Sequence, residues 1–585
     1  MGQMGALRTY WTALGTSRLR LAPARERLGR SLTFPLTALV LCLSGCIPGP
    51  FLRPDDSTTS HCDSPSADET NPDPSSNSAD QQPEKNRKPS PRTLPQAMRA
   101  YWHCLCTHGA ETNDNVEEKK KTSKDDSSNG TSPDKDKEEK DKGAKEGGSS
   151  EEKKENGNSS EEKKNGKEEE AKESWFSAHA QATMVTQTHD VFPSPYIGPK
   201  SLLPVEPSPT SLTATLFLDA RLWKSDEWSG ELVFNPELAG GRGFSGVLGL
   251  AGFPNGENQK VGEVQPTPYF ARLFLRQTWG FGGEQEKVED EPNQIAGTRD
   301  VDRVTVIVGK LSPTDLMDDN RYSHDPRLQY LNWALMYNGA WDYPANVRGY
   351  SYGIGIDFNQ KNWAFRYSIF AEPSFAQGAP LDPKFLKANG QVIELEERYA
   401  VNDHNGRLRL LGYLNRAHMG DYREALEQMP VDPDITATRA YRFKYGFGAN
   451  LEQEITKDLG MFMRLGWDDG HTESWAFTEI DRTAAMGFVL NGRCWCRKQD
   501  QVGLAGVING LSGDHRNYLG AGGVGFQIGD GQLRYGPEEI LETFYNYAIV
   551  KGVNVTFDFQ EVNHPAYNRD RGPVSIYTLR VHIEL

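Results

Sequence analysis

The chain has 585 residues, of which 36% are hydrophobic, and its formal net charge is -16. The acidic balance argues against nucleic acid as a partner, because phosphate binding requires clustered Lys and Arg. No apolar run reaches the roughly 18 residues of a membrane helix, which excludes a helical membrane protein but not a β-barrel.

The first 46 residues predict export from the cytoplasm. Arginines precede a short apolar stretch, SLTFPLTALVLCLSGC at positions 31–46, as in a secretory signal. The motif LSGC at 43–46 resembles the lipobox of bacterial lipoproteins, in which Cys46 is acylated. Ordinary cleavage nearby, with Cys46 incidental, is the alternative.

Two segments of biased composition follow. Residues 47–115 are rich in Pro and Ser and cannot bury a core, although they contain a short Cys/His island, HCLCTH, from His103 to His108. The island has metal-ligand residue types, but a closed metal site needs loops between its ligand pairs, so a partly ordered plug or a periplasmic contact is favoured. Residues 116–173 are a charged Glu/Lys linker, disordered by composition, which is a plain tether or a contact to the cell wall.

From position 174 to 585 the pattern changes to short alternating segments separated by Gly, Pro, Asn and Asp. In residues 211–223 the even positions are apolar and most odd positions are polar. Residues 269–279, 350–359, 441–452 and 553–560 repeat this design. Because a strand sends successive side chains to opposite faces, each segment has one apolar and one polar face.

The last segment, PVSIYTLRVHIEL at 573–585, shows the same alternation at the chain's end. Tyr577, Leu579, Val581, Ile583 and Leu585 share one face, and Thr578, Arg580, His582 and Glu584 share the other. An apolar face toward lipid and a polar face toward a lumen are typical of a transmembrane barrel, and we interpret this segment as its closing strand.

The fold class predicted for 174–585 is all-β: a transmembrane antiparallel β-barrel. The segments are long enough to cross a bilayer when tilted, and Tyr, Trp and Phe recur near their ends as in interfacial girdles. The pattern indicates about sixteen strands, a size that leaves an aqueous channel.

The polar face carries planar donors, acids and aromatic rings, which suit sugars, since charged groups bond hydroxyls and rings stack on apolar sugar faces. A generic wet lumen whose charges pair with one another is the alternative. The candidate contacts on the strands are Arg221, Trp223, Arg272, Arg276, Arg366 and Arg580.

The connection 311–348 is too long for a hairpin turn and too rich in aromatic residues for disorder. We predict that it folds into the lumen and narrows it; a lid on the extracellular rim is the alternative. Its candidate sugar contacts are Asp315, Asp319, Asn320, Arg321, His324, Trp333, Trp341 and Asp342.

Two motifs suggest other chemistry. Residues 520–525 match GxGxxG, but no helix is predicted after them, so glycines at a close strand approach explain them better than a nucleotide site. Cys494 and Cys496 lie in a predicted loop of an oxidising compartment. The sequence leaves three states open for these cysteines: a pair of free thiols, a strained disulfide or an intermolecular link.

Several blocks resemble the carbohydrate-selective porin family (OprB-like), in the same order. They include LWKSDEWSGELVFNPELAGG at 222–241, AGFPNGE at 251–257, residues 318–353, residues 511–547 and NRDRGPVSIYTLRVHIEL at 568–585. The resemblance extends over 174–585 and leaves out the linker. The last residue, Leu585, departs from the aromatic residue with which outer-membrane strands usually end.

The resemblance implies a 16-stranded porin in the outer membrane of a diderm bacterium, passing mono- and small oligosaccharides by passive diffusion. It implies no catalytic residue, cofactor or metal. The implied partners are permeating sugars, outer-membrane lipid and the barrel-assembly machinery, which would recognise the C-terminal strand. An outer-membrane barrel of another class, an enzyme or an envelope tether, is the alternative, as is a secreted sugar-binding β-protein.

Overall fold

The structure is a computed structural model that describes residues 173–257 and 264–585. The predicted signal, Cys46, the Cys/His island and all of the charged linker except Glu173 lie outside the described residues. No helix in the described ranges is long and apolar enough to cross a bilayer.

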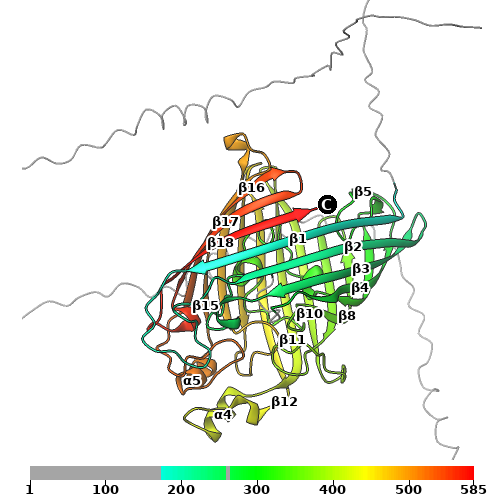
Figure 1. Cartoon of the computed structure of the whole chain (residues 1–585). Coiled ribbons are helices and arrows are strands. Elements are labelled where there is room, and N and C mark those ends of the chain that lie inside the picture. The colour runs from blue at the N-terminus through cyan, green and yellow to red at the C-terminus, as the bar shows by residue number, and fades with distance from the viewer. Residues whose placement is uncertain (1–172, 258–263) are drawn as a thin grey trace, which may run out of the picture. The chain divides into compact units, whose positions relative to one another are not determined.

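Sixteen antiparallel strands form a closed barrel, as predicted (Figure 1). The barrel strands are β1 (Phe176–His189), β2 (Thr210–Lys224), β3 (Trp228–Gly241), β4 (Thr267–Gly280), β7 (Arg303–Leu311), β8 (Ser351–Asn359), β9 (Trp363–Ala371), β10 (Asn389–Val401), β11 (His404–Met419), β12 (Ala440–Glu454), β13 (Leu459–Asp468), β14 (Arg482–Asn491), β15 (Gln501–Gly510), β16 (Glu538–Val550), β17 (Val553–Asn563) and β18 (Val574–Glu584). Each pairs with the next barrel strand, and β18 pairs with β1.

The connections contain one further hairpin and several short helices. The hairpin is β5 (Gln285–Val288) with β6 (Gly297–Asp300), between β4 and β7. The helices are η2 (Phe244–Gly246), η4 (Pro313–Asp315), α3 (Trp333–Met336), α4 (Tyr422–Gln428), η5 (Ile435–Thr438), η6 (Gly492–Trp495), α5 (Gly513–Gly520) and η7 (Pro565–Tyr567).

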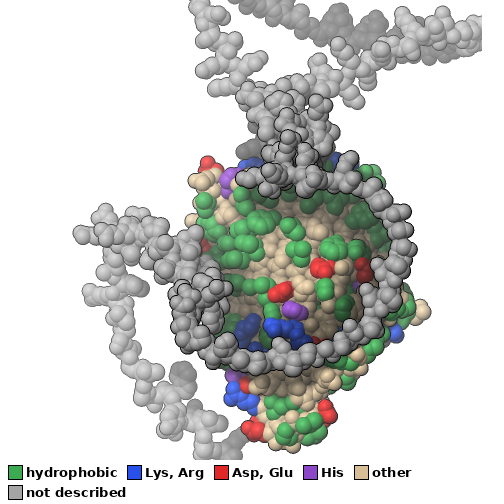
Figure 2. Space-filling view, turned by 90° about the vertical axis from the view of Figure 1, so that its left-hand side faces the viewer, with side chains coloured by type: hydrophobic (Ala, Val, Ile, Leu, Met, Phe, Trp, Pro, Cys, Tyr) green, Lys and Arg blue, Asp and Glu red, His purple; other side chains and the backbone are tan. Residues whose placement is uncertain are grey.

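The two-residue alternation separates an outer face from a lumen face. In β2, Leu216, Leu218 and Leu222 are 40–49% exposed, whereas Phe217, Asp219 and Arg221 on the other face are buried. Exposed aromatic residues lie near the strand ends, among them Trp228, Trp279 and Trp363 at one end of the barrel. Figure 2 shows broad areas of hydrophobic side chains on the visible face, with charged side chains in smaller groups. An apolar belt with aromatic girdles is the exterior of a membrane barrel.

The final strand closes the barrel, as its sequence predicts. The register pairs Gln181 with Glu584 and His189 with Ile576. On the lumen side, Thr183 and His582 share a hydrogen bond of 2.9 Å, and Gln187 donates to Thr578 at 3.0 Å. Backbone and buried polar bonds therefore both hold the seam.

One strand departs from simple alternation. The β3–β4 register shifts between Asn235 and Pro236, because Ala271 is an extra residue opposite them. Pro236 lacks a backbone N–H and is tolerated at such a bulge. Arg272, Phe274 and Arg276 still face inward, and beyond the bulge Tyr269 rather than Phe270 continues the inward row.

The two ends of the barrel differ. One end carries the start of β1, the end of β18 and short turns such as 402–403 and 551–552, and we call it the short-turn end. The opposite, long-loop end carries α4 and α5 (Figure 1). In outer-membrane barrels the short turns are periplasmic and the long loops extracellular.

Candidate functional site

The connection 312–350, between β7 and β8, folds into the lumen, as the sequence predicts, and we call it the inner loop. It begins with the capping box of η4, in which Ser312 and Asp315 exchange hydrogen bonds. Farther on, the Asn332 side chain caps α3 by accepting from Ala334 N–H. These local bonds give a chain with little regular structure a fixed path.

Buried wall residues satisfy the inner loop's backbone. Arg464, which is 0% exposed, donates to the carbonyls of Ser323 and Leu335 at 2.8 and 2.9 Å. Arg580 donates to the carbonyls of Pro326 and Gln329. Because buried backbone groups cost free energy unless paired, these wall side chains determine where the loop lies.

A carboxylate holds the far part of the inner loop. Asp342, also 0% exposed, accepts from the backbone N–H groups of Trp475, Ala476 and Phe477 at 2.7–2.9 Å. Trp341 is fully buried next to it and packs at 5.4 Å from the ring of Tyr343. The inner loop is therefore joined to the connection between β13 and β14 as well as to the wall.

A cavity of about 120 Å³ remains between the inner loop and the wall of β3 and β4, and we call it the eyelet. Its lining combines charged groups with aromatic rings. The charged residues are Glu237, Glu257, Arg272, Arg327 and Arg348, and the aromatic residues are Phe253, Tyr269, Trp333, Tyr337, Tyr343, Tyr350 and Phe477.

Two eyelet arginines, Arg272 and Arg327, form ion pairs and still border open space. Arg272 forms a two-bond fork with Asp315, at 2.8 and 2.6 Å. Arg327 Nε lies 3.3 Å from Glu257 Oε1. Burial raises the pKa of Glu257, and the neighbouring Arg327 opposes that rise. For the pKa of Arg327, burial favours the neutral form, but Glu257 and Asp325 outweigh it and raise the value.

The eyelet's aromatic residues form a continuous stack. The ring centroids of Phe253 and Trp333 are 5.2 Å apart, with an interplanar angle of 14°. Trp333 and Tyr343 lie 5.5 Å apart at 28°. Arg348 covers the ring of Tyr269 with its guanidinium carbon 4.1 Å from the centroid. Flat apolar faces beside planar donors are the chemistry that fits a sugar ring.

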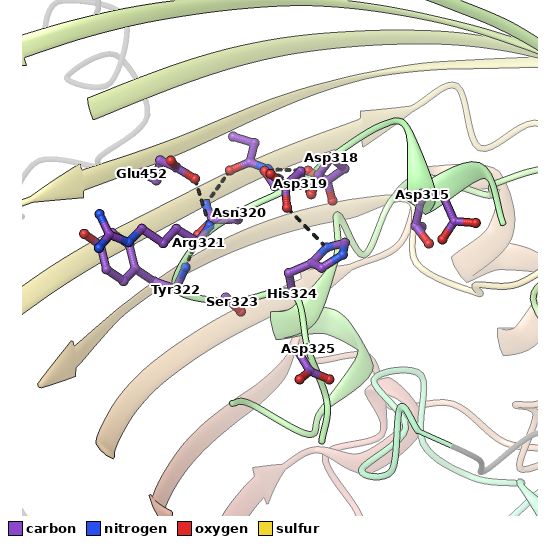
Figure 3. A network of polar contacts seen from close by, with 12 residues as sticks. Asp315, Asp318, Asp319, Asn320, Arg321, Tyr322, Ser323, His324, Asp325 and Glu452 are labelled. Carbon is purple, nitrogen blue, oxygen red and sulfur yellow. Dashed lines mark hydrogen bonds and ion pairs between the residues drawn. The ribbon is translucent and has the colours of Figure 1, made fainter. Parts of the chain in front are cut away.

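A second polar network joins the inner loop to β11–β13 (Figure 3). Asn320 donates to Asn450 at 2.6 Å, and the backbone N–H of Arg321 donates to Glu452 at 2.8 Å. His324 lies 3.9 Å from the carboxylate of Asp319, which also lies 3.5 Å from the guanidinium of Arg409. The Asp319 and Arg321 side chains are 54% and 64% exposed, so this network reaches open lumen.

The candidate contacts thus divide among several locations. Arg272, Trp333 and, through its pair with Arg272, Asp315 belong to the eyelet. The remaining strand candidates have other partners. Arg366 pairs with Glu394 and Glu396, Trp223 donates to Gln277, and Arg221 and Arg276 both bond Glu231.

Four charged residues of the eyelet were missed from the sequence: Glu237, Glu257, Arg327 and Arg348. Glu257 is the last residue of the motif AGFPNGE, and the sequence did not indicate that this connection enters the lumen. Arg327 and Arg348 lie within the predicted inner loop, and their positive charge among aromatic residues was the available signal.

The remaining motifs show no other site in the described residues. Cys494 and Cys496 are free and exposed at the short-turn end. The glycines of 520–525 follow α5 and precede no helix. Among residues 173–257 and 264–585, no group of three or more His, Cys, Asp and Glu side chains is arranged to hold a metal ion.

Comparison with solved structures supports the fold. OprB of Pseudomonas putida aligns with a TM-score of 0.52 and 14% identity, covering 70% of this chain and 94% of that one. Pseudomonas aeruginosa OccK2 (OpdF) gives 0.35 with 10% identity over 70% and 97%. A mutant of the Rh. blastica porin gives 0.34 with 9% identity over 70% and 100%. No curated protein sequence matches this chain.

A sequence profile described as "Carbohydrate-selective porin, OprB family" matches residues 228–585, more than half of the chain. The match begins with β3 and extends through β18. Membership places the barrel in the outer membrane of a Gram-negative bacterium. By this match and by its barrel, the chain belongs to the carbohydrate-selective porin, OprB family.

Proposed function

We propose that sugars cross this porin by passive diffusion through the eyelet, and that the eyelet provides its preference for them. The observation that carries the proposal is the cavity between the inner loop and the β3–β4 wall, where paired charges meet an aromatic stack. This combination favours neutral polyhydroxyl solutes over both apolar solutes and bare ions.

Each kind of group has a part in the proposal. Arg272 keeps its guanidinium fixed by the fork to Asp315, so its remaining N–H groups can bond hydroxyls without reordering. Trp333 is 2% exposed and forms the centre of the aromatic stack that lines the eyelet, and this stack provides the apolar surface for a sugar. Because the ion pairs are already formed, their charges attract free ions less strongly. The hydroxyls of a bound sugar replace the water molecules that otherwise bond these charged groups.

The sequence outside the family match supports further proposals. We infer that residues 1–46 direct export, with Cys46 either lipidated or incidental, and that 47–173 connect the exported N-terminus to the barrel. Chemistry on the sugar is not part of the proposal, since binding and passage explain the eyelet without it. We also propose that β18 presents the signal for barrel assembly, ending in Leu585.

Liposome swelling tests the proposed function. Full-length protein reconstituted in liposomes is expected to admit glucose faster than sugar-impermeable empty liposomes do. Trp333→Ala is expected to weaken block of single-channel current by sugar, because it removes the centre of the aromatic stack that lines the eyelet. Trp495→Ala, in the η6 turn at the barrel rim, is the matched control and is expected to leave sugar block unchanged. Uptake equal to that of empty liposomes contradicts the proposal.

A further inference from the structure

The segment 281–302, between β4 and β7, is unusual for the short-turn end. The neighbouring connections there are tight, such as 225–227 and 360–362. This segment instead contains the β5–β6 hairpin, which Figure 1 shows at the barrel end that also bears the C-terminus. Its tip, residues 289–296, is closed by a reciprocal backbone pairing of Glu291 with Gln294.

The hairpin tip reaches into the barrel. Asn235, which is 0% exposed on β3, donates to the Asn293 side chain at 2.8 Å. Arg276 on β4 donates to the Asn293 carbonyl at 3.0 Å. Ile295 is buried, and its carbonyl accepts from Arg221 on β2 at 3.4 Å. These partners lie on the lumen faces of three successive strands, so the tip occupies lumen.

The tip lies along the same wall as the eyelet. On β3 the eyelet residue Glu237 is followed, toward the short-turn end, by Asn235 and then Glu231. On β4 the eyelet residue Arg272 is followed in the same direction by Arg276. Two residues advance a strand by about 7 Å, so a solute leaving the eyelet along this wall next meets the tip.

The charged groups around the tip lie on β2, β3 and β4, and we call them the exit cluster. Glu231 bonds Arg221 at 3.2 Å and Arg276 at 3.2 Å. Asp219, on the same face of β2 as Arg221, is buried nearby. The guanidinium groups bond both Glu231 and the tip's carbonyls, which ties the hairpin to the ionic pairs of the wall.

The hairpin is also fastened to the start of the barrel. The backbone N–H of Ser174 donates to Ala296 at 3.2 Å, and Ser177 donates to Asp290 at 2.6 Å. Arg221 additionally donates to the Ser174 carbonyl at 2.8 Å. Hydrogen bonds from β1, β2, β3 and β4 therefore hold the hairpin, so it is a fixed part of the barrel rather than a moving lid.

We propose that the β5–β6 hairpin forms a second, periplasmic constriction in series with the eyelet, which sets the size limit at the exit, and that the exit cluster sets the ion preference there. The proposal rests on the proposed function, because it extends the same sugar pathway. It assigns Arg221 and Arg276 to the exit cluster rather than to the eyelet.

Shortening the hairpin tests the constriction. Replacing residues 290–295 with Gly-Ser-Gly is expected to raise single-channel conductance about twofold, since two comparable resistances in series add. Larger oligosaccharides are expected to enter. The matched control shortens the turn 493–498 at the same barrel end, whose contacts are with rim residues such as Asp458 and Tyr545. That variant is expected to keep wild-type conductance.

A point variant keeps the test decisive if the shortened protein fails to assemble. Asn293 has φ of +63°, a conformation that Asp also tolerates, so Asn293→Asp adds a charge at the tip without changing its shape. We expect the reversal potential in a salt gradient to shift toward the value of a more cation-selective channel. Lys551→Gln changes the net charge equally at an exposed turn of the same end and is expected to cause no shift.

The outcomes separate the two proposals. If wild-type protein admits sugar but both hairpin variants match wild type in conductance, size limit and reversal potential, the second constriction is wrong while the sugar pathway stands. If wild-type protein admits no sugar, the proposed function fails, whereas a conductance increase on shortening would still show a constriction for ions.

Discussion

At the scale of single residues, the inward arginines divide by what surrounds them. Arg464 and Arg580 are fully buried and donate to the backbone of the inner loop. Arg272 instead borders the eyelet, with its fork to Asp315 on one side and open space on the other. An inward arginine of this barrel therefore either stabilises the fold or borders the space that is open to a solute.

Arg272→Ala is expected to weaken sugar block of the channel roughly fivefold, corresponding to loss of about 1 kcal/mol from one charge-assisted bond. The reason is that the fork holds the guanidinium ready for hydroxyls at no further ordering cost. Single-channel current with a sugar panel measures the effect. Arg423→Ala is the control, because it removes a similar ion pair outside the lumen, between Arg423 on α4 and Asp514 on α5. Equal loss in both variants would contradict a specific role for Arg272.

Glu372 provides a pH-dependent prediction outside the strands. The residue is 0% exposed, and among the described residues neither of its carboxylate oxygens has a hydrogen-bond partner. Burial, with a smaller effect of Asp342, raises the pKa of Glu372 well above its ordinary value. The folded state thus retains a proton that the unfolded state releases, so stability falls as pH rises above the ordinary carboxyl range.

Glu372→Gln is expected to abolish this slope and to stabilise the barrel at pH 8 by more than about 1.4 kcal/mol, the free energy of a tenfold change in proton affinity. Denaturant unfolding in detergent micelles between pH 5 and pH 9 measures it. Glu427→Gln, at an exposed position of α4, is expected to leave the slope unchanged. A Glu372→Gln protein that keeps the wild-type pH slope would show that another group causes it.

At the scale of elements, the inner loop is ordered by the wall rather than by its own secondary structure. Its only α-helix is α3, which has four residues. Wall carboxylates replace the missing internal bonds: Glu542 accepts from Leu331 and Asn332 N–H at 2.6 and 3.0 Å, and Glu394 accepts from Asp318 N–H at 2.7 Å. A loop held in this way has one conformation only while its anchors are present.

Asp342→Ala is expected to destabilise the protein by about 3 kcal/mol, because three buried N–H groups lose their acceptor together. We also expect noisier current, since the end of the inner loop becomes free to move across the eyelet. Thermal unfolding and single-channel recording measure the two effects. Asp434→Ala removes the cap of η5 on an outer loop and is expected to cost about 1 kcal/mol with quiet current. Quiet wild-type-like current in Asp342→Ala would contradict the anchor.

The two inward segments differ in origin. The inner loop comes from the long-loop end and is anchored mainly by β10–β18, whereas the β5–β6 hairpin comes from the short-turn end and is anchored by β1–β4. The eyelet lies between the inner loop and β3–β4. The hairpin contacts β3 nearer the short-turn end. Both segments therefore border the lumen face of β3 and β4.

At the scale of the whole barrel, closure of the sheet and the apolar exterior both serve insertion into lipid. The β1–β18 pairing removes the free edges that could not be satisfied in lipid. Leu579, on the outer face of the closing strand, is 42% exposed, while Thr578 and Arg580 beside it are buried inward. A polar substitution on the outer face therefore meets hydrocarbon rather than water.

Leu579→Arg is expected to destabilise the membrane-inserted barrel by about 2–4 kcal/mol if Leu579 lies near the bilayer midplane. Folding into lipid vesicles followed by denaturant titration measures the cost. Leu579→Met keeps an apolar side chain of similar size and is the control. Equal stability of the Arg and Met variants would show that this face does not contact lipid.

The sequence by itself determined the strands, their two faces and the inward loop. Alternation between lipid and lumen follows from the two-residue period of a strand and is readable locally, as in 211–223 and 573–585.

Only the tertiary structure decided which polar side chains remain for a solute. Arg580 bonds a carbonyl 254 positions away, and Asn332 is bonded by β17 through Gln560. Such partners depend on where a long connection meets the wall, and no local pattern encodes that. The same holds for the β5–β6 hairpin: its residues indicate a turn, but its insertion beside Arg276 depends on contacts formed once the barrel has closed.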